Sequence, residues 1–490
     1  MEIPWACPAT GIIASGDCPM RTSLFVLMCA VCLPVLPAQS CASVNANPAR
    51  ADWFVDVAAT NLSATGTKSD PFPTIGSAFT VADDNDRVFV APGIYDPAAG
   101  ETFPYQWGAN ASLSQLGVEI IGTAGAANTI VDGGGTASGF GIMRFRLLAA
   151  GAKVRGFTFR GYNGTLGAIR LGSVSANYEA YGVEISHCIF EGSVGSGVAT
   201  FGASAALKIH DNIFVGNFDN GLWCSDITPN VNPCAPVTSG GEVYNNTFVG
   251  NGNGIRLQGG TWSVFNNVIV NSSVNGIFDF GLAGFPSASS SYTLDNNCVF
   301  GNTTDYGGGL VAGANSISAD PMFVNAALND FHLMPGSPCI DAGTGSLPSF
   351  LASDMDDDPR QLAGSSGVRV PDIGADEVND VRHVATSASL AFPVVSYDVI
   401  GPPGDLVQRG YSMGQGNVLI TEGNVLLDLA SLTIIDAAPV SIPASGTLIL
   451  PISLVGLPPS IIGTPIYSQA IVFGASGGRL TNAWTTIICP

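Results

Sequence analysis

The sequence predicts an all-β solenoid followed by a small β-sandwich, and a degenerate repeat is the main reason. In one register the repeat reads KVRGFTF from Lys153, EISHCIF from Glu184, KIHDNIF from Lys208, EVYNNTF from Glu242, SVFNNVI from Ser263 and TLDNNCV from Thr293. Successive starts lie 21 to 34 residues apart. A unit of this size cannot bury its own apolar face and must therefore stack on its neighbours.

One position of the repeat carries Asn in four consecutive units. The fifth residues of the six units are Phe157, Cys188, Asn212, Asn246, Asn267 and Asn297. A side-chain amide can donate to the coil on one side and accept from the coil on the other. The sequence therefore predicts an internal Asn ladder along the solenoid.

Composition supports a β-rich chain with more than one domain. The 490 residues include 61 Gly and 31 Pro, and only 11% are charged. This turn-rich composition is typical neither of a helical protein nor of a disordered one.

Net charge argues against nucleic acid as a partner. The formal net charge is −21, and the only lysines are Lys68, Lys153 and Lys208. Phosphate backbones require a basic face, so a polyanionic ligand would need local arginines or a bridging cation. The simpler interpretation of the charge is an acidic extracellular surface. We also expect the protein to be a monomer.

Residues 1–42 are interpreted as upstream residues and a secretory signal. Met20 and Arg21 precede the apolar run SLFVLMCAVCLPVL, and AQS-CA supplies small residues for cleavage. Translation could start at Met1 or at Met20. A lipid anchor at Cys41 is an alternative, although the Leu usual three positions before such a cysteine is absent. We expect a secreted or cell-surface protein with no membrane span after cleavage.

Six cysteines follow the signal, too few for a disulfide scaffold. Cys224 and Cys234 bracket an insertion and could form a local bridge. Cys188 and Cys298 lie in the repeat, where small buried apolar residues are expected.

Two segments carry a family resemblance. Residues 52–98 contain Gly66-Thr67, Asp70-Pro71-Phe72, Thr74-Ile75, Ala78, Pro92-Gly93 and Tyr95. This segment resembles the start of many bacterial pectin-lyase-like right-handed parallel β-helices, including one family of pectate lyases. The resemblance implies a right-handed parallel β-helix of roughly ten coils, whose open end is capped by a short helix.

The second segment resembles the ending of many bacterial secreted β-helix proteins. It comprises NSISADPMFVNAALNDFHLMPGSPCIDAG at 315–343 and SDMDDDPRQLAGSSGVRVPDIGADEV at 353–378. The predicted domains are therefore a β-helix at 52–378 and a β-sandwich at 384–490. Short alternating apolar runs separated by Pro/Gly turns predict the sandwich, which could serve attachment, sorting or end-capping.

Strand alternation predicts which side chains face the core. The second residue of each unit should point inward, namely Val154, Ile185, Ile209, Val243, Val264 and Leu294. A second strand per coil should bury Ile169, Val198, Leu222, Ile255 and Ile277. The Gly residues before those strands (Gly197, Gly221, Gly254 and Gly276) are predicted to occupy corners with positive φ.

The residues that follow the inward ones should form an outward row. The candidate carbohydrate-binding residues are Arg170, Trp223, Asp226, Arg256 and Phe278, with Gln258 nearby and the loop 225–241 above. Aromatic faces stack on sugar rings, and Arg offers paired donors to carboxylates or sulfates. The alternative is that these side chains are ordinary surface.

Polyuronate cleavage is a further alternative implied by the resemblance. Such lyases need a base for the proton alpha to the uronate carboxylate, and Ca²⁺ to acidify that proton. Lys153, Lys208, Arg170 and Arg256 are basic candidates, but the family's calcium ligands do not transfer onto this sequence. A hydrolase would need two facing carboxylates. Glu184 and Glu242, two coils apart with Lys208 between them, are better interpreted as a salt-bridged stripe.

Asp354, Asp356 and Asp358 are the candidate calcium ligands, because D-x-D-x-D supplies alternating carboxylates. Gly at the sixth and Glu at the twelfth position are absent, which excludes an EF-hand loop. A salt-bridged final coil, with Arg360 paired to Asp372, is the alternative.

Together these features predict a secreted bacterial protein that binds, and possibly processes, an extracellular polysaccharide. A non-catalytic adhesin or spacer and a calcium-dependent polyuronate lyase are the alternatives.

Overall fold

The structure is a computed structural model that describes residues 50–108, 114–136, 139–146, 149–172, 180–202, 204–226, 239–281, 290–334, 336–344, 353–356, 360 and 370–378. Beyond residue 381 it describes residues 439 and 442 and the strands given below. The predicted signal segment lies outside this part. No helix in the described part is long and apolar enough to cross a membrane.

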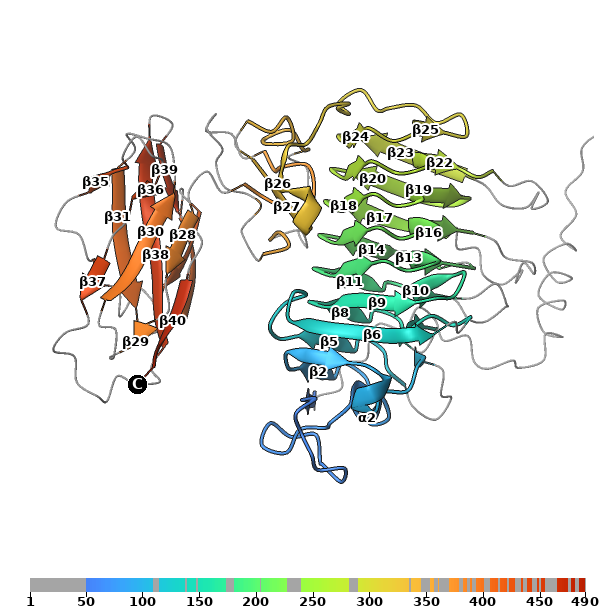
Figure 1. The fold of residues 1–490 in the computed structure, drawn as a ribbon, viewed down its shortest axis with the longest axis horizontal. Helices are drawn as coiled ribbons and strands as arrows, with labels where there is room; N and C mark the ends of the chain where they lie inside the picture. The colour runs from blue at the N-terminus through green and yellow to red at the C-terminus, as the bar shows by residue number, and fades with distance from the viewer. Residues whose placement is uncertain are drawn as a thin grey trace, which may run out of the picture. The chain divides into compact units, whose positions relative to one another are not determined.

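Three long parallel sheets confirm the predicted right-handed parallel β-helix (Figure 1). In the described part, sheet 1 has nine strands in the order β1 (Asp52–Val55), β2 (Arg87–Val90), β5 (Glu119–Gly122), β8 (Lys153–Arg155), β11 (Glu184–Ser186), β14 (Leu207–His210), β17 (Gly240–Tyr244), β20 (Gly260–Phe265) and β23 (Ser290–Asp295). Neighbouring strands of a sheet come from successive coils, so every sheet contact joins residues far apart in sequence.

Sheets 2 and 3 complete each coil. Sheet 2 consists, within the described residues, of β3 (Gly93–Tyr95), β6 (Thr129–Thr136), β9 (Thr158–Tyr162), β12 (Ile189–Glu191), β15 (Ile213–Val215), β18 (Thr247–Val249), β21 (Val268–Val270) and β24 (Cys298–Phe300). Sheet 3 consists, over the same residues, of β4 (Tyr105–Trp107), β7 (Met143–Phe145), β10 (Gly167–Leu171), β13 (Ser196–Thr200), β16 (Asn220–Ser225), β19 (Asn253–Gln258), β22 (Asn275–Asp279) and β25 (Thr304–Gly307).

The core lies inside the coils, as alternation predicts. All the predicted inward residues of sheets 1 and 3 are buried, except that Leu294 is only partly so. Sheet 2 adds a stack of four rings, Phe159, Phe190, Phe214 and Phe248, with centroids 4.6 to 5.3 Å apart. Offset stacking of buried rings stabilises the coils beyond simple burial.

The predicted Asn ladder is confirmed. Nδ2 of Asn212 donates to Oδ1 of Asn246 at 3.0 Å, Asn246 donates to Asn267 at 2.9 Å, and Asn267 donates to Asn297 at 3.0 Å. Each acceptor oxygen also takes the backbone N–H of the preceding rung. The rungs are fully buried, so these bonds satisfy polar groups that would otherwise be costly.

The prediction of positive φ at Gly197, Gly221, Gly254 and Gly276 is wrong. Positive φ occurs instead at the residue before each rung, and we call this set the corner row: His187, Asp211, Asn245, Asn266 and Asn296. These four positions require Gly because a Cβ there would lie within 3 Å of neighbouring backbone or side-chain atoms. A Cβ on Gly221 would lie 2.6 Å from Cδ1 of Phe248 and 2.9 Å from the carbonyl oxygen of Gly254.

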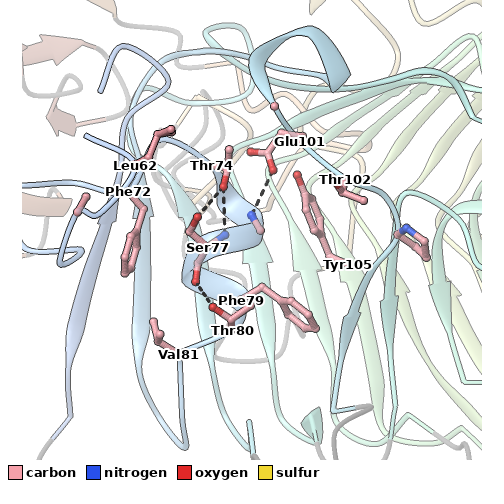
Figure 2. A pocket seen from close by; sticks show the side chains of 14 residues that line it. Leu62, Phe72, Thr74, Ser77, Phe79, Thr80, Val81, Glu101, Thr102 and Tyr105 are labelled. Carbon is pink, nitrogen blue, oxygen red and sulfur yellow. Dashed lines mark hydrogen bonds between the residues drawn. The ribbon is translucent and has the colours of Figure 1, made fainter. Parts of the chain in front are cut away.

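The first coil is closed by the short helix α2 (Ile75–Phe79), followed by η1 (Pro97–Ala99). Ile75 and Ala78 are buried in the same core as the first strands. The carboxylate of Glu101 accepts the backbone N–H of Ile75 at 2.6 Å, and Thr74 caps the helix through Ser77, as Figure 2 shows. The helix therefore covers an open end that would otherwise be a reactive sheet edge.

After the last coil, β26 (Phe323–Asn325), η3 (Ala326–Leu328) and β27 (Asp330–Leu333) lead into a segment that we call the strap, residues 336–378. The strap contacts each member of the corner row. The contacts are Asn296 Nδ2 to Ala342 O at 3.3 Å, Thr344 N to Asn266 Oδ1 at 2.8 Å, Asn245 Nδ2 to Asp372 O at 3.3 Å, Arg360 Nε to Asp211 Oδ1 at 2.7 Å, and Ser353 Oγ to His187 Nε2 at 3.4 Å. The strap thus covers the corner between sheets 1 and 2.

Arg360 is the buried centre of the strap. Its guanidinium pairs with Asp211 and, at 3.4 Å, with Glu377, and it donates to the carbonyl of Gly374 at 2.9 Å. Arg360 is fully buried. The predicted pairing of Arg360 with Asp372 is therefore wrong. Asp372 instead accepts the backbone N–H groups of Asp341 and Val378.

The buried charges continue from Asp211 to His210 and Glu184. Nδ1 of His210 lies 2.7 Å from Asp211, and Nε2 lies 3.8 Å from Glu184, an ion-pair distance. Burial favours a higher pKa for Glu184, but His210 and Lys153 outweigh it and lower that pKa to about 2. Burial opposes a charge on His210, but Asp211 and Glu184 raise its pKa above the ordinary value.

These shifts predict a stability optimum in mildly acidic solution. A carboxylate with a lowered pKa stabilises the fold above its unfolded value of 4.5, and this stability is lost as the pH falls. A histidine with a raised pKa stabilises the fold below its unfolded value of 6.5, and this stability is lost as the pH rises through its folded-state pKa. The free energy of unfolding, from urea titrations, should therefore be greatest between these two values. Glu184→Gln should reduce the loss of unfolding free energy at low pH, whereas Glu242→Gln, in register with it on sheet 1, should not. The same low-pH loss in both variants would contradict the role given to Glu184.

The C-terminal part forms the predicted β-sandwich. Among described residues one sheet contains β28 (Arg382–Ala385), β30 (Val394–Ile400), β36 (Thr447–Leu448) and β37 (Pro451–Ser453). The other contains β29 (Ala388–Ser389), β40 (Trp484–Cys489), β38 (Pro465–Gly474), β31 (Leu406–Ser412), β34 (Thr433–Ile434), β35 (Val440–Ser441) and β39 (Gly477–Leu480). A hairpin comprises β32 (Gln415–Ile420) and β33 (Gly423–Leu427). Val399 from one sheet packs with Val407, Ala470 and Val472 from the other.

Candidate functional site

Sheet 3 presents one outward residue per coil, in a row that we call the Arg/aromatic row. The strand register sets the row as Arg144, Arg170, Ala199, Trp223, Arg256 and Phe278. Arg144 lies on β7, and the strands that carry the other members, β10, β13, β16, β19 and β22, lie one after another in Figure 1. Four of the five predicted binding residues thus lie in one row, because strand alternation and coil stacking place them there.

A second outward row consists of the residues two positions after each member of the first row. It includes Phe201, Gln258 and Phe280, which follow Ala199, Arg256 and Phe278. The ring of Phe201 meets Trp223 edge-on at 4.9 Å, and the ring of Phe280 meets Phe278 edge-on at 6.2 Å. The two rows together form a continuous stack of aromatic and guanidinium groups.

Arg256 is the centre of the exposed part of this stack. Its Cζ lies 4.3 Å from the ring centre of Trp223 and 3.8 Å from that of Phe280. Gln258 Oε1 accepts from Arg256 Nη2 at 3.3 Å and from Trp223 Nε1 at 3.2 Å. Cation–π contact with the two rings holds the guanidinium in place. Its planar fork of N–H donors suits a carboxylate or sulfate.

The charge of Arg256 is not neutralised by a salt bridge. Within the described residues no carboxylate pairs with it, and its buried Nε has no hydrogen-bond partner there. Burial lowers the pKa of Arg256, while the charge of Asp219 acts in the opposite direction. A half-buried, unneutralised guanidinium in a chain of net charge −21 is available to an anionic ligand.

Arg170 lies in the row but is covered. Only 5% of it is exposed, its Nη1 donates to Gly139 O at 2.6 Å, and its Cζ lies 5.0 Å from the ring centre of Phe201. Burial lowers its pKa. Arg170 therefore supports the stack, and Trp223, Arg256 and Phe278 remain its half-buried members.

Asp226 follows β16 and lies beside Gln258, to whose carbonyl its backbone N–H donates at 2.9 Å. Burial raises the pKa of its half-buried carboxyl. Residues 227–238 of the loop predicted to overhang the row lie outside the described residues. The same holds for Cys234, so the proposed bridge to the buried thiol of Cys224 is not tested.

The sequence interpretation missed Phe201, Phe280, Phe140 and Arg144. Phe201 and Phe280 stand two positions after row members, so strand alternation could have found both. Arg144 lies on a coil before the recognisable repeat, and Phe140, 4.9 Å from the guanidinium of Arg144, precedes that strand. No repeat signal marks either residue.

Two other basic residues of the coils are paired with carboxylates. Lys153 lies 3.4 Å from Glu184 on sheet 1, where the register also places Lys208 between Glu184 and Glu242, as in the predicted stripe. Arg160 on sheet 2 pairs with Asp132 at 2.7 Å and Glu191 at 3.7 Å. Arg256 differs from Lys153 and Arg160 in having no salt bridge to a described carboxylate.

The predicted calcium ligands lie in or beside the strap. Both oxygens of buried Asp354 accept backbone N–H groups, from Asp356 and Glu377. Asp356 lies 2.7 Å from His332 Nε2, and Asp358 lies outside the described residues. In the described part, the group with metal-ligand spacing is His332, Asp356 and Asp376, within 4.8 Å of one another. Calcium binding by Asp354, Asp356 and Asp358 stays a prediction.

A pocket of about 450 Å³ lies beside α2 at the capped end. Glu101 and Tyr105 face it from one side and Phe72 from the other, as Figure 2 shows. Burial raises the pKa of Glu101, whose carboxylate already caps α2. The pocket contains no member of the Arg/aromatic row and is explained by closure of the first coil.

Comparisons with solved structures give weak similarities to enzymes. A rhamnogalacturonan lyase is 13% identical with a TM-score of 0.33, over 55% of this chain and 68% of that one. A PL6 family alginate lyase is 14% identical with a TM-score of 0.36, over 55% of this chain and 35% of that one. The pectate lyase Pel9A is 12% identical with a TM-score of 0.33, over 67% of this chain and 97% of that one. At such TM-scores these similarities carry no argument about function.

Comparison with curated proteins gives no match. A family model matches residues 57–320, which include the described strands of sheets 1, 2 and 3 except β1 (Asp52–Val55). Because this match covers more than half of the sequence, the chain belongs to the family described as "Protein of unknown function (DUF1565)".

Proposed function

We propose that this protein binds an acidic extracellular polysaccharide along sheet 3, with Arg256 as the anion contact and Trp223 and Phe280 as the aromatic contacts. The observation that carries the proposal is the guanidinium of Arg256, held between two rings with no salt bridge to a described residue. Arg donors bind carboxylates and sulfates, and aromatic faces stack on sugar rings. A ligand with both features matches this surface.

The length of the row favours a chain over a single sugar. Two steps between stacked strands separate Trp223 from Phe278, the two ends of the half-buried part of the row. At about 4.8 Å per step this part spans roughly 10 Å. An extended acidic glycan can therefore contact several coils at once, because the side chains of successive coils lie along one line.

Replacing Trp223 with alanine tests the aromatic contact. The change removes a stacking face and one wall of the Arg256 site, so we expect affinity for polyuronates to fall about 3- to 10-fold. Binding would be measured by titration or affinity electrophoresis with polygalacturonate, alginate and neutral glucans. Phe218→Ala is the matched control, since Phe218 is an 80% exposed aromatic on the same coil but outside the row. Equal losses in both variants, or none in either, would contradict the proposal.

Cleavage of the bound glycan is a second candidate, favoured by one observation. Arg256 would lie beside the bound uronate, where lyase chemistry requires a basic group to remove the proton alpha to the carboxylate, and burial lowers its pKa. Incubation with pectins and alginates, with and without Ca²⁺, would show unsaturated products by their ultraviolet absorbance. A calcium-dependent rise that Arg256→Gln abolishes supports a lyase. Binding without any rise supports a non-catalytic binding protein, and neither binding nor a rise supports a spacer.

A further inference from the structure

We propose that Cys298 and Cys339 form a disulfide bond that fastens the strap to the last coil of the β-helix. The two residues are 41 positions apart in the sequence. Cys298 begins β24, and Cys339 lies in the strap. The bond would close the segment that contains β25, β26 and β27 into a covalent loop.

The two thiols meet inside one apolar cluster. Both residues are fully buried, and the cluster also contains Val268, Leu333 and Ile373. Both are free thiols in the structure, and each is the main influence on the pKa of the other, lowering that of Cys298 and raising that of Cys339. The thiol of Cys298 also donates to the carbonyl of Ala319 at 3.2 Å, as that of Cys188 does to the carbonyl of Ser186. Cys188 and Cys224, the other cysteines of the β-helix in the described part, differ in lying outside this cluster, in the coil interior.

Backbone pairing holds both cysteines in place. Cys298 forms a parallel bridge with Ile317. On the other side, the carbonyl of Cys339 accepts from Ile373 N at 2.9 Å, and its N–H donates to Ser337 Oγ at 3.1 Å. Backbone hydrogen bonds thus fix Cys298 in a strand and Cys339 in a turn, with both side chains in the same cluster.

The oxidation balances with a disulfide as the electron acceptor. While the strap is open, deprotonated Cys298 is an accessible attacking thiolate. It attacks the acceptor disulfide and releases one acceptor thiol. Cys339, after losing its proton, then attacks the mixed disulfide and releases the second thiol. Two protons and two electrons thus leave the pair, and the acceptor is a thiol–disulfide oxidoreductase of an oxidising compartment, or oxidised glutathione in vitro.

The order of events follows from burial. Neither sulfur is exposed once the strap is in place, so the exchange must occur before the strap docks fully or during a local opening. The signal predicted at residues 20–42 would deliver the chain to a compartment where such bonds persist. The disulfide would then make docking of the strap irreversible under non-reducing conditions.

Differential alkylation of the exported full-length chain tests the proposal. The protein is purified without reductant, unfolded, treated with iodoacetamide, then reduced and treated with N-ethylmaleimide. We expect the second label on Cys298 and Cys339 and the first label on Cys188, which serves as the internal control. Without the reduction step, one peptide pair linked through Cys298 and Cys339 should appear in the digest. First-label modification of Cys298 and Cys339, or a link from either to another cysteine, would overturn the proposal.

Single substitutions give a second readout. In Cys339→Ser, Cys298 should become fully reactive toward the first label. Reductant should lower the thermal midpoint of the wild type by several degrees but leave that of Cys339→Ser unchanged. Equal sensitivity of both proteins to reductant would show that no such bond contributes.

Discussion

Replacing Arg360 with methionine should lower the free energy of unfolding of the strap by about 3–5 kcal/mol. Arg360 and its partner Asp211 are fully buried, and Glu377 is almost so. Removing the guanidinium leaves two carboxylates in the interior without their counter-charge. Burial already raises the pKa of Glu377, whereas Arg360 and His210 outweigh burial and lower that of Asp211.

The lost stability should first appear as local opening of the strap and not as unfolding of the whole β-helix. The coils contact mainly their neighbours, so the β-helix can persist while the strap opens. Hydrogen exchange should show faster exchange at strap amides such as those of Ile373 and Gly374, which bond to Cys339 and Asn266. The core strands of sheet 2 should change little. An unchanged exchange rate in the strap would contradict the role given to Arg360.

A double-mutant cycle isolates the ion pair. Asp211→Asn alone should also destabilise the strap, because among the described residues it leaves Arg360 with a single salt bridge, to Glu377 at 3.4 Å. The combination of Asp211→Asn with Arg360→Met should cost less than the sum of the two single changes. Additive costs would show that the two side chains do not act together.

The second large effect concerns binding. Arg256→Gln should reduce affinity for acidic glycans about 10- to 100-fold, because a charge-assisted hydrogen bond to a carboxylate is lost. Arg256→Lys should recover only part of the affinity, since an ammonium lacks the planar edge that Trp223 and Phe280 hold. The control is Arg155→Gln, an exposed arginine on sheet 1. A comparable loss in the control would indicate general electrostatic attraction instead of a site.

The Arg256 and Trp223 changes should not be additive. Trp223 contacts the guanidinium and shares Gln258 with it, so removing Trp223 also frees Arg256. The double variant should therefore lose less affinity than the two single losses combined. Full additivity would place the two residues in separate sites.

Much of the fold could be predicted because each coil repeats one pattern. The position of Asn212, Asn246, Asn267 and Asn297 in the repeat predicts the ladder, since only a shared register brings these amides together. Strand alternation likewise predicts that Trp223 and Arg256 point outward. The glycines were misassigned, because a Gly pattern alone does not distinguish a positive φ from close packing against Phe248.

The strap contacts could not be predicted from the repeat. Asp211 and Arg360 are 149 residues apart, and nothing in a local pattern pairs a corner residue with a later segment. The same limit applies to Cys298 and Cys339. Around the candidate site, Phe280 was within reach of the alternation argument, but the covering of Arg170 by Phe201 depends on side-chain packing that the sequence does not specify.

The central claim is that sheet 3 binds an acidic glycan through Arg256. The most direct measurement is a titration of wild type and Arg256→Gln with a size-defined oligouronate and with its neutral counterpart, at low and at high salt. The account predicts that the wild type binds the oligouronate, more weakly at high salt, and that both the neutral sugar and the variant bind poorly. Equal binding of the acidic and neutral sugars, or of the wild type and the variant, would contradict it.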